Sequence, residues 1–393
     1  MTDRLFANAV DIHGHPLRLA VRDGRFVEAG VQPAAAEVVD LRGALVLPGF
    51  VDGHIHLDKS FVGDVWRPHV PAATLRERLA VEKRLLAQAK PMVERADALI
   101  AQAVSFGTLA MRCHVDVDAT TGLSHLHAVL EAAEKWRDTV AIEIVAFPQA
   151  GVASCPGTAE VLDAAMREGA DVVGGIDPSA LDGDAKAQLD VVFGLAERHG
   201  ARIDIHLHEP GQQGIEQLLR IAFRTAAAGL SGRVAVSHAY ALGEVAPDTL
   251  ERTAAALAAA GVSIMTNAPG DRPFPPVRRL REAGVRVFAG NDNIRDAWWP
   301  YGNGDLLQRA MLIGYRSGFH TDDELRIALD LVTHAPASVI GLKDYGLSPG
   351  DEASFVVLDA RNGADAVAGV PCARRVVVRG EWLPARASSL STG

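Results

Sequence analysis

Two histidine pairs in the sequence have the spacing and the context that a metal site requires. His54 and His56 close one apolar run, His206 and His208 close another, and both runs are typical of buried β-strands. Side chains two residues apart on a strand point to the same side, so each pair can direct two imidazoles toward one point. Each pair could therefore supply half of a metal-binding site. The alternative is a chance pair in an ordinary core or surface position.

The two remaining His-x-His pairs have less suitable contexts. His13 and His15 flank a glycine in a stretch of short strands, and we expect them at the surface. His125 and His127 lie in a segment with a helical pattern. Residues two apart on a helix point in different directions, so this pair is a poor chelate.

The centre of the chain alternates between strand patterns and helix patterns, which predicts the elements that must position these histidines. After the strand that ends at His56, strands are predicted at 108–114, 141–147, 171–176, 202–208, 233–238, 262–266 and 285–289. Helices are predicted at 72–105, 159–167, 185–199, 215–228 and 250–260. Eight strand-then-helix units over roughly 300 residues predict an α/β fold, a (β/α)₈ TIM barrel. A doubly wound open sheet is the alternative, but no Gly-x-Gly-x-x-Gly follows the first strand.

Polar residues gather where the predicted strands end, which is the face that carries the active site in a barrel of this kind. Only the fourth strand, which ends in Asp177-Pro178, adds little. The other strand ends supply the pairs already described and His114, Asp116, Gln149, Glu209, His238, Asn267, Asn291, Asp292 and Asn293.

Short strands at both chain ends predict a second, smaller β unit. The segments 17–22 and 25–28 flank a hairpin turn, and 354–358 and 375–378 have a similar pattern. We therefore predict a small β-sandwich domain formed by residues 1–47 and 345–393, around a barrel of residues 48–344.

The composition limits which kinds of protein and which partners are possible. A hydrophobic fraction of 48% and a charged fraction of 22% are ordinary for a globular protein. A net charge of −10 argues against a nucleic-acid partner. No apolar run is long enough to cross a membrane, and the first residues do not have the pattern of a signal peptide. The three scattered cysteines, Cys113, Cys155 and Cys372, are typical of free thiols in the cytoplasm. These features are compatible with a homo-oligomer.

The motifs together resemble the amidohydrolase superfamily and, within it, the cytosine deaminase-like group. The resemblance covers the whole chain and rests on Val51-Asp52-Gly53-His54-Ile55-His56-Leu57-Asp58, the segment 145–149, His206-Leu207-His208-Glu209, Ser237-His238-Ala239, and Asn291-Asp292-Asn293 with Trp298-Trp299-Pro300. It implies a metal-dependent aminohydrolase that acts on the ring C–N bond of a small nitrogen heterocycle, either a cytosine-like pyrimidine or an aminotriazine.

The resemblance also implies roles for individual residues. One divalent ion per chain, zinc or alternatively iron, would be bound by His54, His56, His206 and Asp292. The catalytic residues would be Glu209 as the acid that protonates a ring nitrogen, His238 as the group that orients hydroxide, and Asp292 as the proton acceptor. Gln149 would bind the ring carbonyl and its neighbouring N–H, and Trp298 would form a wall of the pocket.

Two residues, Asn293 and His208, depart from the cytosine deaminase pattern, and together with Lys59 they resemble instead the triazine-hydrolysing enzymes of the group. Asn293 stands where a second aspartate is expected, and His208 and Lys59 accompany it. We expect all three to contact the substrate. The alternatives are a loop cap for Asn293, a loop charge for Lys59, and a hydrogen bond to a neighbouring side chain for His208. His114 and Asp116 would hold the ligands in place.

Other enzyme classes lack their own signatures. The fourth predicted strand contains no lysine to bridge two metals, the chain has no Pro-Cys-x-x-Cys, and no Gly-x-Ser-x-Gly follows a predicted strand. Another cyclic-amide or N-alkylamino hydrolase of the superfamily, or a non-catalytic ligand-binding relative, remain as alternatives.

Overall fold

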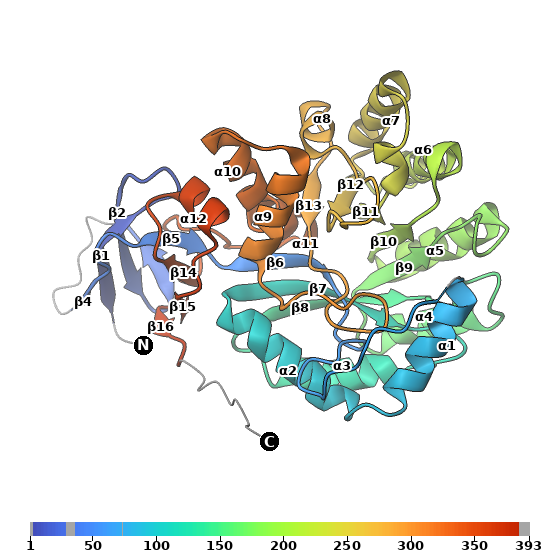
Figure 1. The fold of residues 1–393 in the computed structure, drawn as a ribbon, viewed down its shortest axis with the longest axis horizontal. Coiled ribbons are helices and arrows are strands. Elements are labelled where there is room, and N and C mark those ends of the chain that lie inside the picture. The colour runs from blue at the N-terminus through green and yellow to red at the C-terminus, as the bar shows by residue number, and fades with distance from the viewer. Residues whose placement is uncertain (1–2, 29–35, 73, 385–393) are drawn as a thin grey trace.

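A computed structural model describes residues 3–28, 36–72 and 74–384 (Figure 1). Its largest unit is a barrel of eight parallel strands surrounded by helices, as predicted. In sheet order these strands are β6 (Phe50–Ile55), β7 (Thr108–Asp116), β8 (Ala141–Phe147), β9 (Val172–Ile176), β10 (Arg202–Leu207), β11 (Val234–His238), β12 (Ser263–Thr266) and β13 (Val287–Ala289).

Two glycines allow the first and last strands to meet and close the barrel. A side chain at Gly53 would come within 2.4 Å of Phe288, and one at Gly290 would come within 2.4 Å of the backbone of His54. The backbones can therefore approach, and the N–H of Asp292 donates to the carbonyl oxygen of His54 at 2.7 Å. Barrel closure thus places Asp292 beside the first predicted metal ligand.

The helices that follow the strands cover the outside of the barrel. They are α2 (Met92–Ser105), α3 (Ser124–Glu134), α4 (Thr158–Arg167), α5 (Ala185–His199), α6 (Gly211–Ala227), α7 (Pro247–Ala260), α8 (Val277–Glu282), α9 (Leu306–Ser317), α10 (Asp322–Asp330) and α11 (His334–Ile340). Apolar residues of the strands and of the inner helix faces form one large buried core. No helix among the described residues is both long and apolar enough to cross a membrane.

The predicted helix 72–105 is wrong as a single element. The chain forms α1 (Leu75–Leu86) and then α2, which begins after Pro91. Proline has no backbone N–H and its ring clashes with the preceding turn, so a continuous helix cannot pass through this position. Residue 73 of the predicted helix lies outside the described residues.

Both chain ends contribute to a second sheet. It runs in the order β16 (Glu381–Trp382), β15 (Arg374–Val378), β14 (Phe355–Leu358), β5 (Leu45–Pro48), β1 (Arg4–Val10), β2 (Pro16–Arg22) and β3 (Arg25–Val27), with β4 (Glu37–Asp40) paired to β1, and α12 (Gly363–Gly369) lies between β14 and β15 in the chain. The terminal β unit is thus present, while the domain boundaries given above remain a prediction.

Candidate active site

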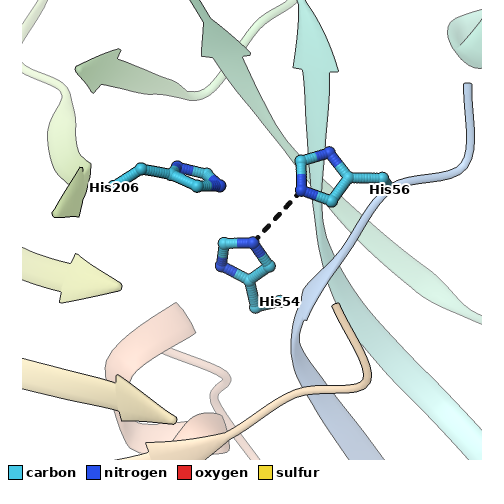
Figure 2. Close-up of side chains that lie close together, drawn as sticks. All are labelled: His54, His56 and His206. Carbon is cyan, nitrogen blue, oxygen red and sulfur yellow. Dashed lines mark hydrogen bonds between the residues drawn. The ribbon is translucent and has the colours of Figure 1, made fainter. Parts of the chain in front are cut away.

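Histidines from several strands converge at the carboxyl ends of the barrel. His54 belongs to β6, His56 follows it, and His206 belongs to β10, whose position across the barrel turns it toward the first two (Figure 2). The ring nitrogens of these three residues lie within 4.8 Å of one another, and all three side chains are buried. His54 also forms such a group with His238 and Asp292.

The distances between the predicted ligand atoms fit a tetrahedral metal ion. Nε2 of His54 lies 3.3 Å from Nε2 of His56, and Oδ1 of Asp292 lies 3.5 Å from each of them. Ligand atoms bound at 2.0–2.2 Å around a tetrahedral ion are about 3.3–3.6 Å apart. Both ring nitrogens of His206 and Nδ1 of His56 are buried with no hydrogen-bond partner among the described residues. The residues present therefore fit a divalent ion.

A relay of hydrogen bonds fixes the tautomer of His54. The hydroxyl of Ser237 donates to Oδ1 of Asp204 at 2.7 Å and lies 2.9 Å from Nδ1 of His54. A hydroxyl has a single proton, so Ser237 must accept a hydrogen bond from Nδ1–H of His54. Nε2 of His54 is then unprotonated and free to bind a metal. Arg112 supports the relay by donating to Oδ2 of Asp204 at 2.9 Å.

The electrostatic environment keeps His54, His206 and His238 neutral. Burial lowers the pKa of His54 and of His206 well below 6.5, and the neighbouring imidazoles lower that of His206 further. Burial also lowers the pKa of His238, to about 3. Neutral imidazoles are the form that binds a metal. Burial acts in the opposite direction on Asp292, but the histidines around it outweigh burial and hold its pKa below 3.8.

His114 and Asp116, both predicted to support the ligands, end β7. The ring of His114 stacks on that of His54 with centroids 3.8 Å apart, so His114 fixes the plane of the His54 ring. Asp116 instead lies 2.9 Å from the ammonium group of Lys59 and holds that side chain in place.

Two predicted catalytic residues lie in strained backbone beside the ligand group. His238 has φ +74° and Asp292 has φ +61°, a region that residues other than glycine rarely adopt. Such strain persists where the surrounding structure holds it, often at functional sites. Asn267 donates to Oδ2 of Asp292 at 2.7 Å, and Nδ1 of His238 lies 4.0 Å from the same oxygen.

A cavity of about 1220 Å³ opens over the ligand group. The five predicted substrate contacts, Gln149, His208, Asn293, Trp298 and Lys59, all line it. Segments outside the barrel strands line the cavity too. They include Arg78 of α1 and His69 of the loop before α1.

Glu209 is placed differently from the other predicted catalytic residues. Its side chain is buried and does not line the cavity. Oε1 accepts hydrogen bonds from the backbone N–H groups of Ser179 at 2.7 Å and Ala180 at 2.6 Å, and Oε2 lies 3.1 Å from the hydroxyl of Ser179. In this conformation Glu209 fixes the loop after β9.

The prediction that the fourth strand end adds little is wrong, because Asp177 lines the cavity and holds His208. Oδ1 accepts from the backbone N–H of His208 at 2.6 Å, and Oδ2 lies 2.9 Å from Nδ1 of His208. Nε2 of His208 is thereby turned to the cavity, where the ring stacks on His238 with centroids 4.6 Å apart. The position of Asp177 at the end of a barrel strand was the available signal. Arg112 and Asp204, inside the barrel, gave no comparable signal.

Comparison with known proteins assigns the family. A family model described as the amidohydrolase family matches residues 37–383. The chain belongs to the amidohydrolase family. The enzyme class predicted from the sequence, a hydrolase of carbon–nitrogen bonds, agrees with this membership.

Related proteins align with most or nearly all of the chain. The crystal structure of N-isopropylammelide isopropylaminohydrolase from Burkholderia multivorans is 41% identical, with a TM-score of 0.93 over 97% of this chain and 98% of that one. That of 5-methylcytosine deaminase from Klebsiella pneumoniae is 28% identical, with a TM-score of 0.86 over 98% of each chain. N-isopropylammelide isopropyl amidohydrolase from Pseudomonas sp. strain ADP is 33% identical over 85% of this chain and 84% of its own length.

Proposed function

We propose that this amidohydrolase is a mononuclear aminohydrolase that replaces an amino or alkylamino group on a ring carbon of an aminotriazine or a cytosine-like pyrimidine. The observation that carries the proposal is the tetrahedral spacing of His54, His56 and Asp292 beneath a cavity lined by amide and aromatic side chains. Relatives named for ammelide and cytosine derivatives support the substrate class.

His54, His56, His206 and Asp292 would hold the ion, which we expect to be zinc, with iron as the alternative. When bound, a divalent ion supplies a Lewis acid and brings the pKa of a coordinated water near neutrality. The pKa of Asp292, held below 3.8 by the histidines around it, keeps its carboxylate ionised, and this residue would accept a proton from the attacking water. His238, buried 4.0 Å from Asp292, can donate a hydrogen bond to the oxygen that attacks the ring.

Side chains that line the cavity would orient the substrate ring. Trp298 lines the cavity with an apolar face for a flat ring, and its indole N–H is fixed by a hydrogen bond to Glu82. The water oxygen bonds to the ring carbon, a ring nitrogen is protonated, and the amine leaves with a proton. Glu209 is our proposed donor of the proton to the ring nitrogen, and His208 is the alternative. The cavity exceeds the volume of a single ring, which leaves room for an N-alkyl group.

The test is a screen of metal-loaded protein against cytosine, isocytosine, ammelide and N-alkylated ammelides, with release of ammonia or amine as the readout. We expect turnover of at least one of these rings. Hydrolysis of saturated cyclic amides alone would support the other hydrolase class. Binding without turnover would support a non-catalytic relative.

A further inference from the structure

Tyr240 lies beside the proposed catalytic residue His238 and has no role in the function proposed above. Its hydroxyl oxygen lies 3.3 Å from Nδ1 of His238, and the centroids of the two rings are 5.5 Å apart. The side chain of Tyr240 is buried and lines the cavity. A phenol in this position can reach the reacting atoms of a bound ring.

A strained turn brings Tyr240 to this position. His238 has φ +74° and Ala239 has φ +45°, so two successive residues that carry a Cβ adopt the left-handed region. The N–H of Ala239 donates to the carbonyl oxygen of Leu207 at 3.0 Å, which holds the turn against β10. Tyr240 then begins the short 3₁₀ helix η1 (Tyr240–Gly243). Strain of this kind is concentrated at functional sites, and here it folds the phenol ring back against His238.

Arg272 packs over the ring of Tyr240. Its guanidinium carbon lies 5.2 Å from the ring centroid, a cation–π contact, and its Nη2 donates to Oδ2 of Asp271 at 2.8 Å. Burial and Asp292 raise the pKa of Tyr240 above 10, and the opposing effect of Arg272 does not outweigh them. The hydroxyl therefore keeps its proton at neutral pH and remains a hydrogen-bond donor.

The number of protons between His238 and Tyr240 leaves the hydroxyl free to donate to a substrate. Nδ1 of His238 is also the nitrogen that lies 4.0 Å from Oδ2 of Asp292, on the side of the proposed metal ligands. A neutral imidazole has one N–H group, so a His238 that donates from Nδ1 to the attacking oxygen cannot accept there from Tyr240. The hydroxyl has no other hydrogen-bond partner in the described part of the chain. Its proton is then available to a bound ring.

We propose that Tyr240 is a further catalytic residue, whose hydroxyl donates a hydrogen bond to the nitrogen that leaves the ring carbon. Its oxygen and Nδ1 of His238 are 3.3 Å apart, a separation that suits two atoms bonded to the same carbon. In the planar substrate the lone pair of the amino nitrogen is delocalised into the ring, so this nitrogen accepts poorly. Attack makes the carbon tetrahedral and localises the lone pair. A hydrogen bond that forms only then raises kcat rather than affinity for the substrate.

The inference rests on the proposed function, because it assigns a protein group to the amine that this function releases. Tyr240 keeps its proton throughout the reaction. The water oxygen bonds to the ring carbon, and the bond between this carbon and the amino nitrogen breaks. The amine leaves with a proton that Asp292 has taken from the water.

The test compares the binding of two probes to the metal-loaded protein by calorimetry. One probe is a cyclic phosphinate analogue of cytosine, in which a tetrahedral phosphorus with two oxygens replaces the reacting carbon. The other is uracil, whose carbon at this position is planar. We expect the wild type to prefer the phosphinate, and Tyr240→Phe to lower this preference by on the order of tenfold, because one donor to a charged oxygen is lost.

Two further measurements on Tyr240→Phe accompany the binding test. Metal content should be unchanged. For the substrate found in the screen, kcat should fall by on the order of tenfold or more at a similar KM. Tyr301→Phe is the matched control, since it removes a hydroxyl from a 67% exposed position on the rim of the same cavity and should keep the wild-type preference.

A double-variant comparison separates a direct contact from an effect through His238. In a His238→Asn background, Tyr240→Phe should weaken phosphinate binding by a similar factor, because the hydroxyl itself contacts the ligand. A preference that Tyr240→Phe leaves unchanged, or a loss that disappears in the His238→Asn background, would overturn the inference alone. A wild type that does not prefer the phosphinate would contradict the proposed function, and the inference with it.

Discussion

His125, in the first turn of α3, forms a hydrogen-bonded ion pair with Asp58, two residues beyond the proposed metal ligand His56: Nδ1 lies 2.9 Å from Oδ2. Burial alone would lower the pKa of His125, but Asp58 outweighs it and raises the pKa above 6.5. A raised pKa means that the pair contributes its full stability below the pKa of unfolded histidine and loses it as the pH rises through the folded value.

We therefore expect His125→Gln to destabilise the protein by about 1 kcal/mol or more at pH 6 and by less at pH 9, since the wild-type pair weakens in alkali. Urea unfolding of wild type and variant at both pH values checks this. His127→Gln is the matched control on the same helix, because His127 pairs with Glu168 at the exposed surface, where ion pairs contribute little. An equal loss at the two pH values would contradict the ion pair.

The relay through Ser237 predicts an effect on metal affinity. Ser237→Ala removes the acceptor for Nδ1–H of His54, so the ring loses its fixed tautomer. Loss of such a supporting hydrogen bond typically costs ten- to a hundredfold in metal affinity. Competition with a chromophoric chelator measures the dissociation constant. Ser105→Ala, at the exposed end of α2, is the control, and equal affinities for both variants would show that the relay does not tune the site.

The ligand set predicts one tightly bound ion per chain. Metal analysis should find near-stoichiometric metal in the wild type and little in His206→Ala, because that variant removes one of four proposed ligands. His127→Ala should retain the wild-type content. A second tightly bound ion in each wild-type chain would contradict a mononuclear site.

The proposed proton transfer by Glu209 can be tested with a variant that keeps the fold. Glu209→Gln keeps an oxygen that can accept from the N–H groups of Ser179 and Ala180, so we expect unchanged stability and metal content. Turnover of the substrate found in the screen should fall about a hundredfold or more if the carboxyl group transfers a proton. Turnover near the wild-type level would assign the donor elsewhere, and His208→Gln is then the variant to measure.

The barrel could be predicted because hydrophobic patterns repeat locally, and its strands match the predicted ones to within two residues at each end. The candidate site followed because a barrel gathers the residues at its strand ends, whatever the details of packing. The break at Pro91 was also readable, since proline inside a helical pattern signals an end.

The supporting contacts could not be predicted. Ser237 reaches His54 because the register of β10 and β11 sets Ser237 opposite His206, and no local pattern encodes that register. The orientation of Gln149 depends on Lys59, ninety positions away in the chain. The direction of the Glu209 side chain depends on the loop after β9. Each of these is a tertiary contact between residues distant in sequence.

The strand that carries His54 continues directly from the terminal sheet, with only Gly49 between β5 and β6. β5 pairs with β14, so the strand that carries the first proposed ligand is anchored by residues that are synthesised long after it. A growing chain therefore cannot complete the support of its proposed metal site until residues 355–358 have left the ribosome. Fusion tags or truncations that disturb the C-terminal strands should for this reason be judged by metal content as well as by yield.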